Sequence, residues 1–199
     1  MESLLVISLN NKMDIKKYKA NVFGKECTME LMDFNKKDGK RWKELFDMWK
    51  KLKLGMREYK SREPNFPEGL SEVAFCLFSK SMRFISLQGE SPASFDTFDL
   101  KKNRAEQIKA SSVESDLTSF GPISKWDDLY FLDFYNNGKL DGTFNVYKIP
   151  SQWIYEMKVN KKQTFRQQQK QGKRPRFSII DNIVKKKELK PIARNVKVW

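Results

Sequence analysis

The stretch Ser94 to Ser112, SFDTFDLKKNRAEQIKASS, has the pattern of a β-hairpin, and the rest of the fold is organised around it. Phe95 and Phe98 anchor the first arm, and LKKN at 100–103 can form the turn. The second arm, 104–112, alternates between two sets of side chains, as a strand with two different faces does. We therefore expect a hairpin here, with one arm supplying acidic residues and the other a mixed polar face.

Three kinds of chemical group converge on one face of this hairpin. Side chains two residues apart on a strand share a face, about 6.6 Å apart. Gln107 and Lys109 therefore point the same way, toward a first arm that contains Asp96 and Asp99. An acid, a second oxygen ligand and a lysine can hold a hard divalent cation and activate a water. An ordinary amphipathic hairpin with a solvated charged face has the same pattern, so other parts of the chain must decide.

The composition of the chain limits the kinds of catalytic and metal site that it can form. A chain of 199 residues is most simply one domain, in which we expect an N-terminal helical part (1–60), a catalytic core (61–150) and a basic C-terminal part (151–199). The sequence has no histidine, and Cys27 and Cys76 show no pairing or metal spacing. Zinc fingers and histidine-based catalytic triads are therefore excluded, and acid–base chemistry must use Asp, Glu, Lys, Tyr or a metal-bound water.

Nothing in the sequence suggests a membrane or secretory location. The N-terminal run MESLLVISLNNKMD has an acid before a short apolar stretch and lacks a small-residue cleavage site. No stretch approaches the roughly 18 apolar residues of a membrane span. We expect a cytoplasmic protein.

The positive charge is concentrated at the C-terminal end. The net charge is +14, and residues 158–199 hold 14 Lys and Arg against Asp181 and Glu188, which is +12. Residues 158–176 contain eight Lys and Arg, five glutamines and no acid. A polyanion is the expected partner of such a segment, and nucleic acid is the usual one, because the segment lacks the apolar helical face that a membrane surface requires.

The same segment has side chains suited to reading DNA. A solvated helix would mix in glutamates for i,i+4 pairs, whereas Lys, Arg and Gln contact phosphates and base edges. Thr164 and Gln167 can form a capping box, and Gly172 can end the short helix. We expect DNA contacts from hydroxyl, amide and basic side chains in two stretches: Ser111, Ser112, Ser119, Lys161, Lys162, Gln163, Arg166, Gln167, Gln169, Lys173, Arg174 and Arg176.

The remaining pattern predicts alternating helices and strands. Apolar residues recur at helical spacing at Trp42, Leu45, Phe46, Trp49 and Leu52, which indicates core or dimer packing, and Gly55 can close that helix. A second helix should start after Pro67 and run to about 82. We expect strands at 83–88, 128–135 and 143–149, with Asn137-Gly138 forming a hairpin turn between the last two. We also expect a helix at 151–157, a strand or core segment at 177–184, and a C-terminal tail anchored by Trp199. Residues 1–39 show only modest patterning.

Three ordered stretches resemble a known family, the small type II restriction endonucleases that cleave GCNGC, within the PD-(D/E)xK nuclease superfamily. They are NFPEGLSE at 65–72, EQIKASSVESDLTSFGP at 106–122 and NKKQTFRQQQKQGKRPRFSI at 160–179. With the strands between them they cover about residues 60 to 180. The resemblance implies an α/β fold with a mixed central sheet and flanking helices, and Mg²⁺-dependent cleavage of both strands of a near-palindromic site by a homodimer, leaving 5′-phosphate and 3′-hydroxyl ends.

The resemblance also implies roles for individual residues. Asp96 becomes the metal-binding acid, Gln107 occupies a position that is usually acidic, Lys109 becomes the catalytic lysine, and Glu72 becomes a supporting acid from the preceding helix. The main-chain carbonyl of Ile108 would complete the metal ligands together with Gln107 and water. Glu106 is adjacent, but strand alternation points it away from Lys109.

Several alternatives stay open at this point. Asp99 could replace Asp96 as the metal ligand, because the turn is hard to align. Glu72 could be an N-terminal helix charge with no role in the site. The chain could also be a repair or structure-specific nuclease of the same superfamily, or a nucleic-acid-binding protein without activity, which the glutamine at 107 and the lack of histidine favour.

Overall fold

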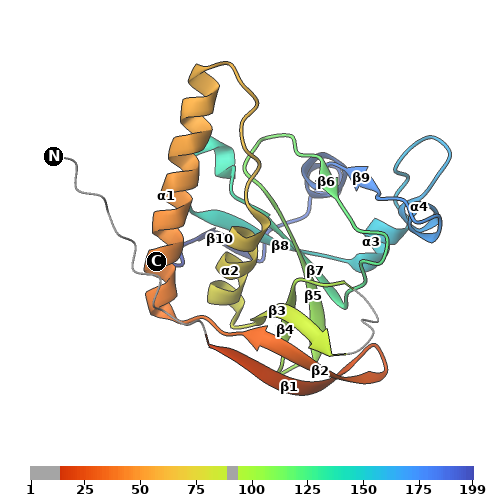
Figure 1. The fold of residues 1–199 in the computed structure, drawn as a ribbon. Helices are drawn as coiled ribbons and strands as arrows, with labels where there is room; N and C mark the ends of the chain where they lie inside the picture. The colour runs from red at the N-terminus through yellow and green to blue at the C-terminus, as the bar shows by residue number, and fades with distance from the viewer. Residues whose placement is uncertain (1–13, 89–93) are drawn as a thin grey trace.

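The computed structural model describes residues 14–88 and 94–199, which form a mixed β-sheet with helices on both of its faces (Figure 1). The sheet has eight strands in the order β1–β2–β3–β4–β5–β7–β8–β10. Their bounds are β1 Ile15–Val22, β2 Lys25–Met32, β3 Met82–Gln88, β4 Thr97–Asp99, β5 Arg104–Ser111, β7 Asp128–Asp133, β8 Phe144–Ile149 and β10 Ala193–Val196. Within this sheet β5 and β7 pair in parallel, and the other neighbours are antiparallel. The expected mixed α/β fold with flanking helices is confirmed at this level.

The hairpin around which the sequence is organised is present. Thr97 pairs with Glu106 and Asp99 with Arg104, so residues 100–103 form the turn as predicted. The second arm then continues as a central strand of the sheet, where it pairs with β7 on its other side. A central position makes β5 a rigid support for the side chains at 107 and 109.

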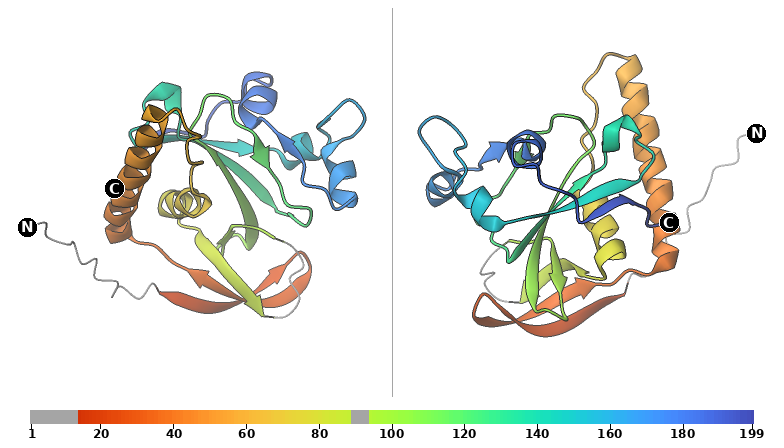
Figure 2. Two further views of the ribbon diagram at one scale, coloured as in Figure 1. Left: turned by 45° about the horizontal axis from the view of Figure 1, so that its top comes forward. Right: turned by 180° about the vertical axis from the view of Figure 1, so that it is seen from behind.

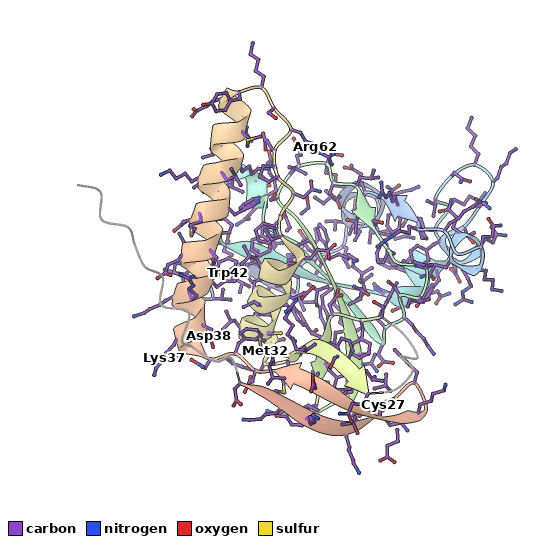
Figure 3. The ribbon with its side chains drawn as sticks, viewed as in Figure 1. Cys27, Met32, Lys37, Asp38, Trp42 and Arg62 are labelled. Atoms are coloured by element: carbon purple, nitrogen blue, oxygen red, sulfur yellow. The ribbon has the colours of Figure 1, made fainter. Side chains whose placement is uncertain are left out.

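Two helices cover one face of the sheet. They are α1 (Lys36–Glu58) and α2 (Glu68–Ser79), and they enclose a core with Trp42, Phe46 and Trp49 against the sheet. The indole N–H of Trp42 donates to the carbonyl of Leu70 at 2.8 Å, and Figure 3 shows Trp42 on the side of α1 that faces α2. As expected, Trp199 anchors the tail, since its ring stacks on Trp42 with centroids 5.7 Å apart.

The opposite face carries short elements from the C-terminal third. They are α3 (Ser151–Tyr155), α4 (Phe165–Lys170), the π-helical turn η2 (Ile180–Lys185) and a two-stranded sheet of β6 (Thr118–Ser119) and β9 (Arg176–Phe177). A second core of aromatic and branched side chains, including Phe120, Phe131 and Phe165, fills the space beneath them. Figure 2 shows α4 and α1 at opposite sides of the molecule in both views.

The first helix departs from the prediction in two ways. Gly55 does not close it, because the helix continues to Glu58, and it begins with a capping box between Asn35 and Asp38 that was not predicted. Leu45 and Leu52, expected among the packed apolar residues, are 37% and 56% exposed. The buried stripe is therefore narrower than the apolar pattern suggested, and α1 has a second apolar face turned to solvent.

Three further predictions need correction. The N-terminal part expected to be helical contains the β1–β2 hairpin within its described residues. The second half of the 177–184 segment is the turn η2 instead of a strand, although Ile180 and Ile183 are buried as core. Asn137-Gly138 lies in the 3-10 turn η1 (Asn136–Gly138), inside a connection longer than a two-residue hairpin. The strands predicted at 83–88, 128–135 and 143–149 are confirmed as β3, β7 and β8, and the helix after Pro67 and the cap at Thr164 are also where the sequence placed them.

Within the described residues, none of the helices has the length and apolarity to cross a membrane.

Candidate active site

The carboxylate of Asp96 is the centre of the site. Its Oδ2 accepts a hydrogen bond from the main-chain N–H of Ile108 at 2.8 Å and another from the side-chain amide of Gln107. The main chain at 96 is also tied to the second arm, because its N–H donates to the carbonyl of Glu106 at 2.9 Å. The hairpin register thus places the acid of the first arm directly against residues 107 and 108 of the second.

Burial dominates the electrostatics of this acid. The pKa of Asp96 is raised to about 7, mainly by loss of solvent and to a smaller extent by the nearby carboxylates of Glu72 and Glu68. The ammonium of Lys109 and the N–H of Ile108 act in the opposite direction. A buried acid held between like charges and one lysine is the kind of group that a cation would stabilise in its ionised form.

Gln107 brings an unused oxygen to this cluster. The residue is only 2% exposed, and its Oε1 has no hydrogen-bond partner among the described residues. Leaving a buried acceptor unsatisfied costs about 1–3 kcal/mol. Such an atom beside a buried carboxylate points to a ligand that completes its coordination.

Lys109 leads from this cluster into a cleft. Its Nζ lies 5.3 Å from the ring centroid of Phe120, which is fully buried and supports the lysine side chain from below. The cleft has a volume of about 780 Å³ and lies between the segment that joins α1 to α2 and the β6–β9 sheet. Its lining includes Ile108 and Lys109, and the main-chain N–H of Ile108 connects it to the carboxylate of Asp96.

The two other acids of the hairpin are engaged elsewhere. Asp99 caps its own turn, because its carboxylate accepts from the N–H groups of Lys101 and Lys102 and from the Nζ of Lys102 at 2.7 Å. Burial opposes ionisation of Asp99, but these bonds outweigh it and lower its pKa. Glu106 is buried on the other face of β5, where Thr97 donates to it at 2.8 Å. Of the two aspartates that the sequence left open, the structure brings only Asp96 to Gln107.

The acids of α2 occupy different positions. Glu72 forms an ion pair with Arg83 at 2.5 Å and is 13% exposed. Glu68, one helical turn earlier, is exposed and lines the cleft together with Lys109. The prediction named Glu72 alone, and Glu68 is a second acid on the same helix; the four-residue spacing of the two acids in PEGLSE is the pattern that indicates it.

One wall of the cleft is held by a buried lysine. Lys53 of α1 is 2% exposed and pairs with Glu63 at 2.6 Å, while Arg57 donates to the same carboxylate at 2.6 Å. Hydrogen bonds from Arg57 and Lys53 lower the pKa of Glu63 to about 2. These bonds fasten segment 61–66, which contributes to the cleft wall, to the end of α1 (Arg62 is labelled in Figure 3).

Four of the residues expected to contact DNA line this cleft. They are Ser111, Ser112, Ser119 and Arg176. The β6–β9 pairing sets Ser119 directly opposite Arg176. The Oγ of Ser119 is buried and has no partner within the described part of the chain, whereas that of Ser111 is bonded to the main chain of Val113.

The other expected contacts lie around α4, outside the cleft lining. The basic members are exposed: Lys161, Lys162, Arg166, Lys173 and Arg174. The glutamines are partly used within the protein, since Gln167 caps α4, Gln163 bonds to Gln171, and Gln169 donates to the carbonyls of Gly121 and Ser124. We therefore expect the basic side chains to be more available to DNA than these amides.

A cleft lined by Lys109, with the carboxylate of Asp96 bonded to Ile108 in the same lining, suits phosphodiester hydrolysis, and comparison with known proteins identifies the class as type II restriction endonucleases. Residues 34–186 match the model of the Bsp6I restriction endonuclease family. The type II restriction enzyme Bsp6I of Bacillus sp. (strain RFL6) is 34% identical over 172 residues, which cover 83% of this chain and 94% of that enzyme. The chain belongs to the Bsp6I restriction endonuclease family and is a deoxyribonuclease. No solved structure matches it.

This assignment resolves the alternatives at the level of function. A type II restriction enzyme acts on DNA, so the non-enzymatic binding protein and the repair nuclease are both set aside. The family match starts at residue 34, so the β1–β2 hairpin lies outside it.

Proposed function

We propose that this enzyme cleaves both strands of GCNGC, or a closely related near-palindromic site, in a Mg²⁺-dependent reaction carried out by a homodimer of PD-(D/E)xK fold. The target is suggested by its relative, because Bsp6I recognises GCNGC. The observation that supports the chemistry is the contact of Asp96 with Gln107 and Ile108, next to a cleft that Ile108 and Lys109 line. The expected products carry 5′-phosphate and 3′-hydroxyl ends.

The residues present fit a hard cation. Among the described residues, no group of three or more His, Cys, Asp or Glu side chains could hold a metal, so neutral oxygens must contribute. Asp96, the unpartnered Oε1 of Gln107 and the carbonyl of Ile108 are the proposed ligands. When bound, Mg²⁺ would lower the pKa of a coordinated water and stabilise charge on the phosphate.

The protein's own groups have distinct proposed tasks. Lys109 holds the attacking water or a phosphate oxygen through its ammonium, positioned over Phe120. Glu72 and Glu68 add negative charge near Asp96 and so favour a cation there; Glu68 is the one that lines the cleft. Ser111, Ser112, Ser119 and Arg176 contact the sugar–phosphate backbone at the cleft.

Incubation of supercoiled plasmid with the protein tests this function. With Mg²⁺ the plasmid should yield discrete fragments that map to GCNGC or a related site, and without Mg²⁺ it should stay intact. A panel of defined duplexes then separates the candidates for the target sequence. Random degradation, or equal cleavage with chelator present, would contradict the proposal.

A separate prediction concerns Arg174, which is exposed beside Pro175 in the stretch most similar to the family. We propose that it reads a base, so Arg174→Ala should cost roughly 1–3 kcal/mol on the cognate site and relax discrimination at one base pair. Lys161→Ala should instead weaken all duplexes alike and flatten the slope of log K against log salt by about 0.9. Binding to cognate and single-mismatch duplexes across a salt series measures both effects. A uniform loss for Arg174→Ala would make this arginine a phosphate contact.

A further inference from the structure

We propose that the exposed face of α1 is the dimer interface of this enzyme, where α1 packs antiparallel against α1 of a second copy and crosses it at Gly55. The inference rests on the proposed function, which requires a homodimer, and adds the surface through which that dimer forms.

The first observation is an apolar stripe on the outer side of the helix. Leu45, Met48, Leu52 and Tyr59, the last of these at the C-cap, are 37%, 58%, 56% and 83% exposed. Their spacing of three, four and seven residues keeps them on one face. Five of the ten large exposed apolar residues in the described chain lie on α1 or its cap; the fifth is Leu54. A contiguous exposed apolar patch marks an interaction site.

This stripe is distinct from the face that holds the helix to the core. The inner face of α1 is buried through Trp42, Phe46 and Trp49. The stripe occupies a different, neighbouring face of the same helix. Figure 1 shows α1 along one side of the molecule, with its C-terminal half rising past the sheet. The described residues thus leave the stripe open to another molecule.

The second observation is a glycine with no local purpose. Gly55 lies inside the helix next to the stripe, where glycine is less favourable than alanine because it has more conformational freedom to lose. A Cβ at this position would meet no atom within 4 Å, so the packing of one chain does not require glycine. Two helices that cross closely do require a small residue at the contact, since the interaxial distance depends on the side chains there.

The third observation is charge. Lys51 and Glu58 border the stripe, four residues before and three residues after Gly55, and neither forms an ion pair within residues 14–88 and 94–199. A two-fold axis at Gly55 reverses one helix relative to the other, so Lys51 of each copy faces Glu58 of the other, twice. Parallel pairing would set like charges together.

The position of this crossing suits an enzyme that cuts two strands. The C-terminal end of α1 leads directly into segment 61–66, which lines the cleft that holds Lys109. Pairing at Gly55 therefore places two clefts close to the same two-fold axis. A near-palindromic site has a matching axis.

Sedimentation of the full chain, without DNA or metal, tests the interface. The wild type should be a dimer at micromolar concentration. Leu52→Glu and Gly55→Gln should each raise the dimer dissociation constant roughly 100-fold or more, because each change acts twice across the axis. Lys51→Glu and Glu58→Lys should each weaken the dimer, and the two combined should restore it.

Controls separate this result from misfolding and from the nuclease activity. Gly55→Gln should keep the helical circular dichroism of the wild type, because glutamine is the better helix former. Ile123→Glu, a change at a 66% exposed isoleucine outside α1, should leave the dimer intact. A monomeric wild type, or variants of α1 that dimerise normally, would overturn the inference. A dimeric wild type that fails to cut DNA with Mg²⁺ would instead contradict the proposed function and leave the interface standing.

Discussion

Asp96→Asn is expected to abolish Mg²⁺-dependent cleavage while binding of the cognate duplex persists. The substitution keeps the size of the side chain but removes the one carboxylate that contacts both Gln107 and Ile108. Loss of a charged ligand removes several kcal/mol of transition-state stabilisation, so cleavage should fall by roughly 10³-fold or more. Single-turnover cleavage at saturating enzyme measures the loss, and a mobility-shift assay measures binding.

Two neighbouring acids provide matched controls. Glu106→Gln alters an acid on the same hairpin whose pKa is also raised to about 7 by burial, but it faces Thr97 on the other side of the sheet. Asp99→Asn alters an acid that caps the turn. Both variants should retain cleavage far better than Asp96→Asn. An inactive Asp99→Asn protein beside an active Asp96→Asn protein would reverse the assignment.

The same acid should also give the metal-free protein a characteristic pH dependence. An aspartate in an unfolded chain ionises near pH 4, whereas burial raises the pKa of Asp96 in the folded protein to about 7. Between these values the folded state binds more protons than the unfolded state, so the free energy of unfolding should fall as pH rises from about 4 to 7. Urea unfolding in chelator should show this fall, and Asp96→Asn should reduce it.

Lys109→Ala is expected to lower the cleavage rate by about 10² to 10⁴, the range for a positioned proton-transfer group. The ammonium reaches the cleft over the ring of Phe120, at the point where Ile108 and Asp96 meet the cleft floor. Its proposed role is confined to the reacting phosphate, so affinity for the cognate duplex should change little. Rapid-quench cleavage and equilibrium binding, measured on the same duplex, separate the two effects.

Lys102→Ala is the matched control for this lysine. Lys102 lies in the turn of the same hairpin and pairs with Asp99 at 2.7 Å, with its side chain 69% exposed. Its removal should leave the cleavage rate within a few-fold of wild type. A Lys109→Ala protein that loses affinity and rate in equal proportion would make Lys109 a DNA-binding residue without a separate part in the reaction.

The local sequence pattern was enough to predict the β4–β5 hairpin and the cluster of site residues that its strand pairing brings together. Alternation along β5 put Gln107 and Lys109 on one face, and the four-residue turn brought Asp96 to them. The capping box at Thr164 and the helix after Pro67 were equally predictable, because both depend on residues close in sequence.

Long-range packing was not accessible in this way. The β1–β2 hairpin joins the sheet by pairing with β3, about fifty residues further on, and the short apolar alternation of its lysine-rich first strand does not identify this distant partner. Helical spacing marked Leu45 and Leu52 as apolar positions but could not say which face of α1 meets the sheet. The ion pair of Glu72 with Arg83 and the position of Glu68 in the cleft lining likewise depend on tertiary structure.

The ion pair between buried Lys53 and partly exposed Glu63 has a thermodynamic consequence for the whole assembly. A shift of segment 61–66 against α1 would separate Lys53 from its partner carboxylate, so this pair opposes independent motion of the segment. Motion at the cleft wall is therefore transmitted to the helix that is proposed to join the two subunits. The free energies of DNA binding and of subunit association become coupled, so each should strengthen the other by the same factor.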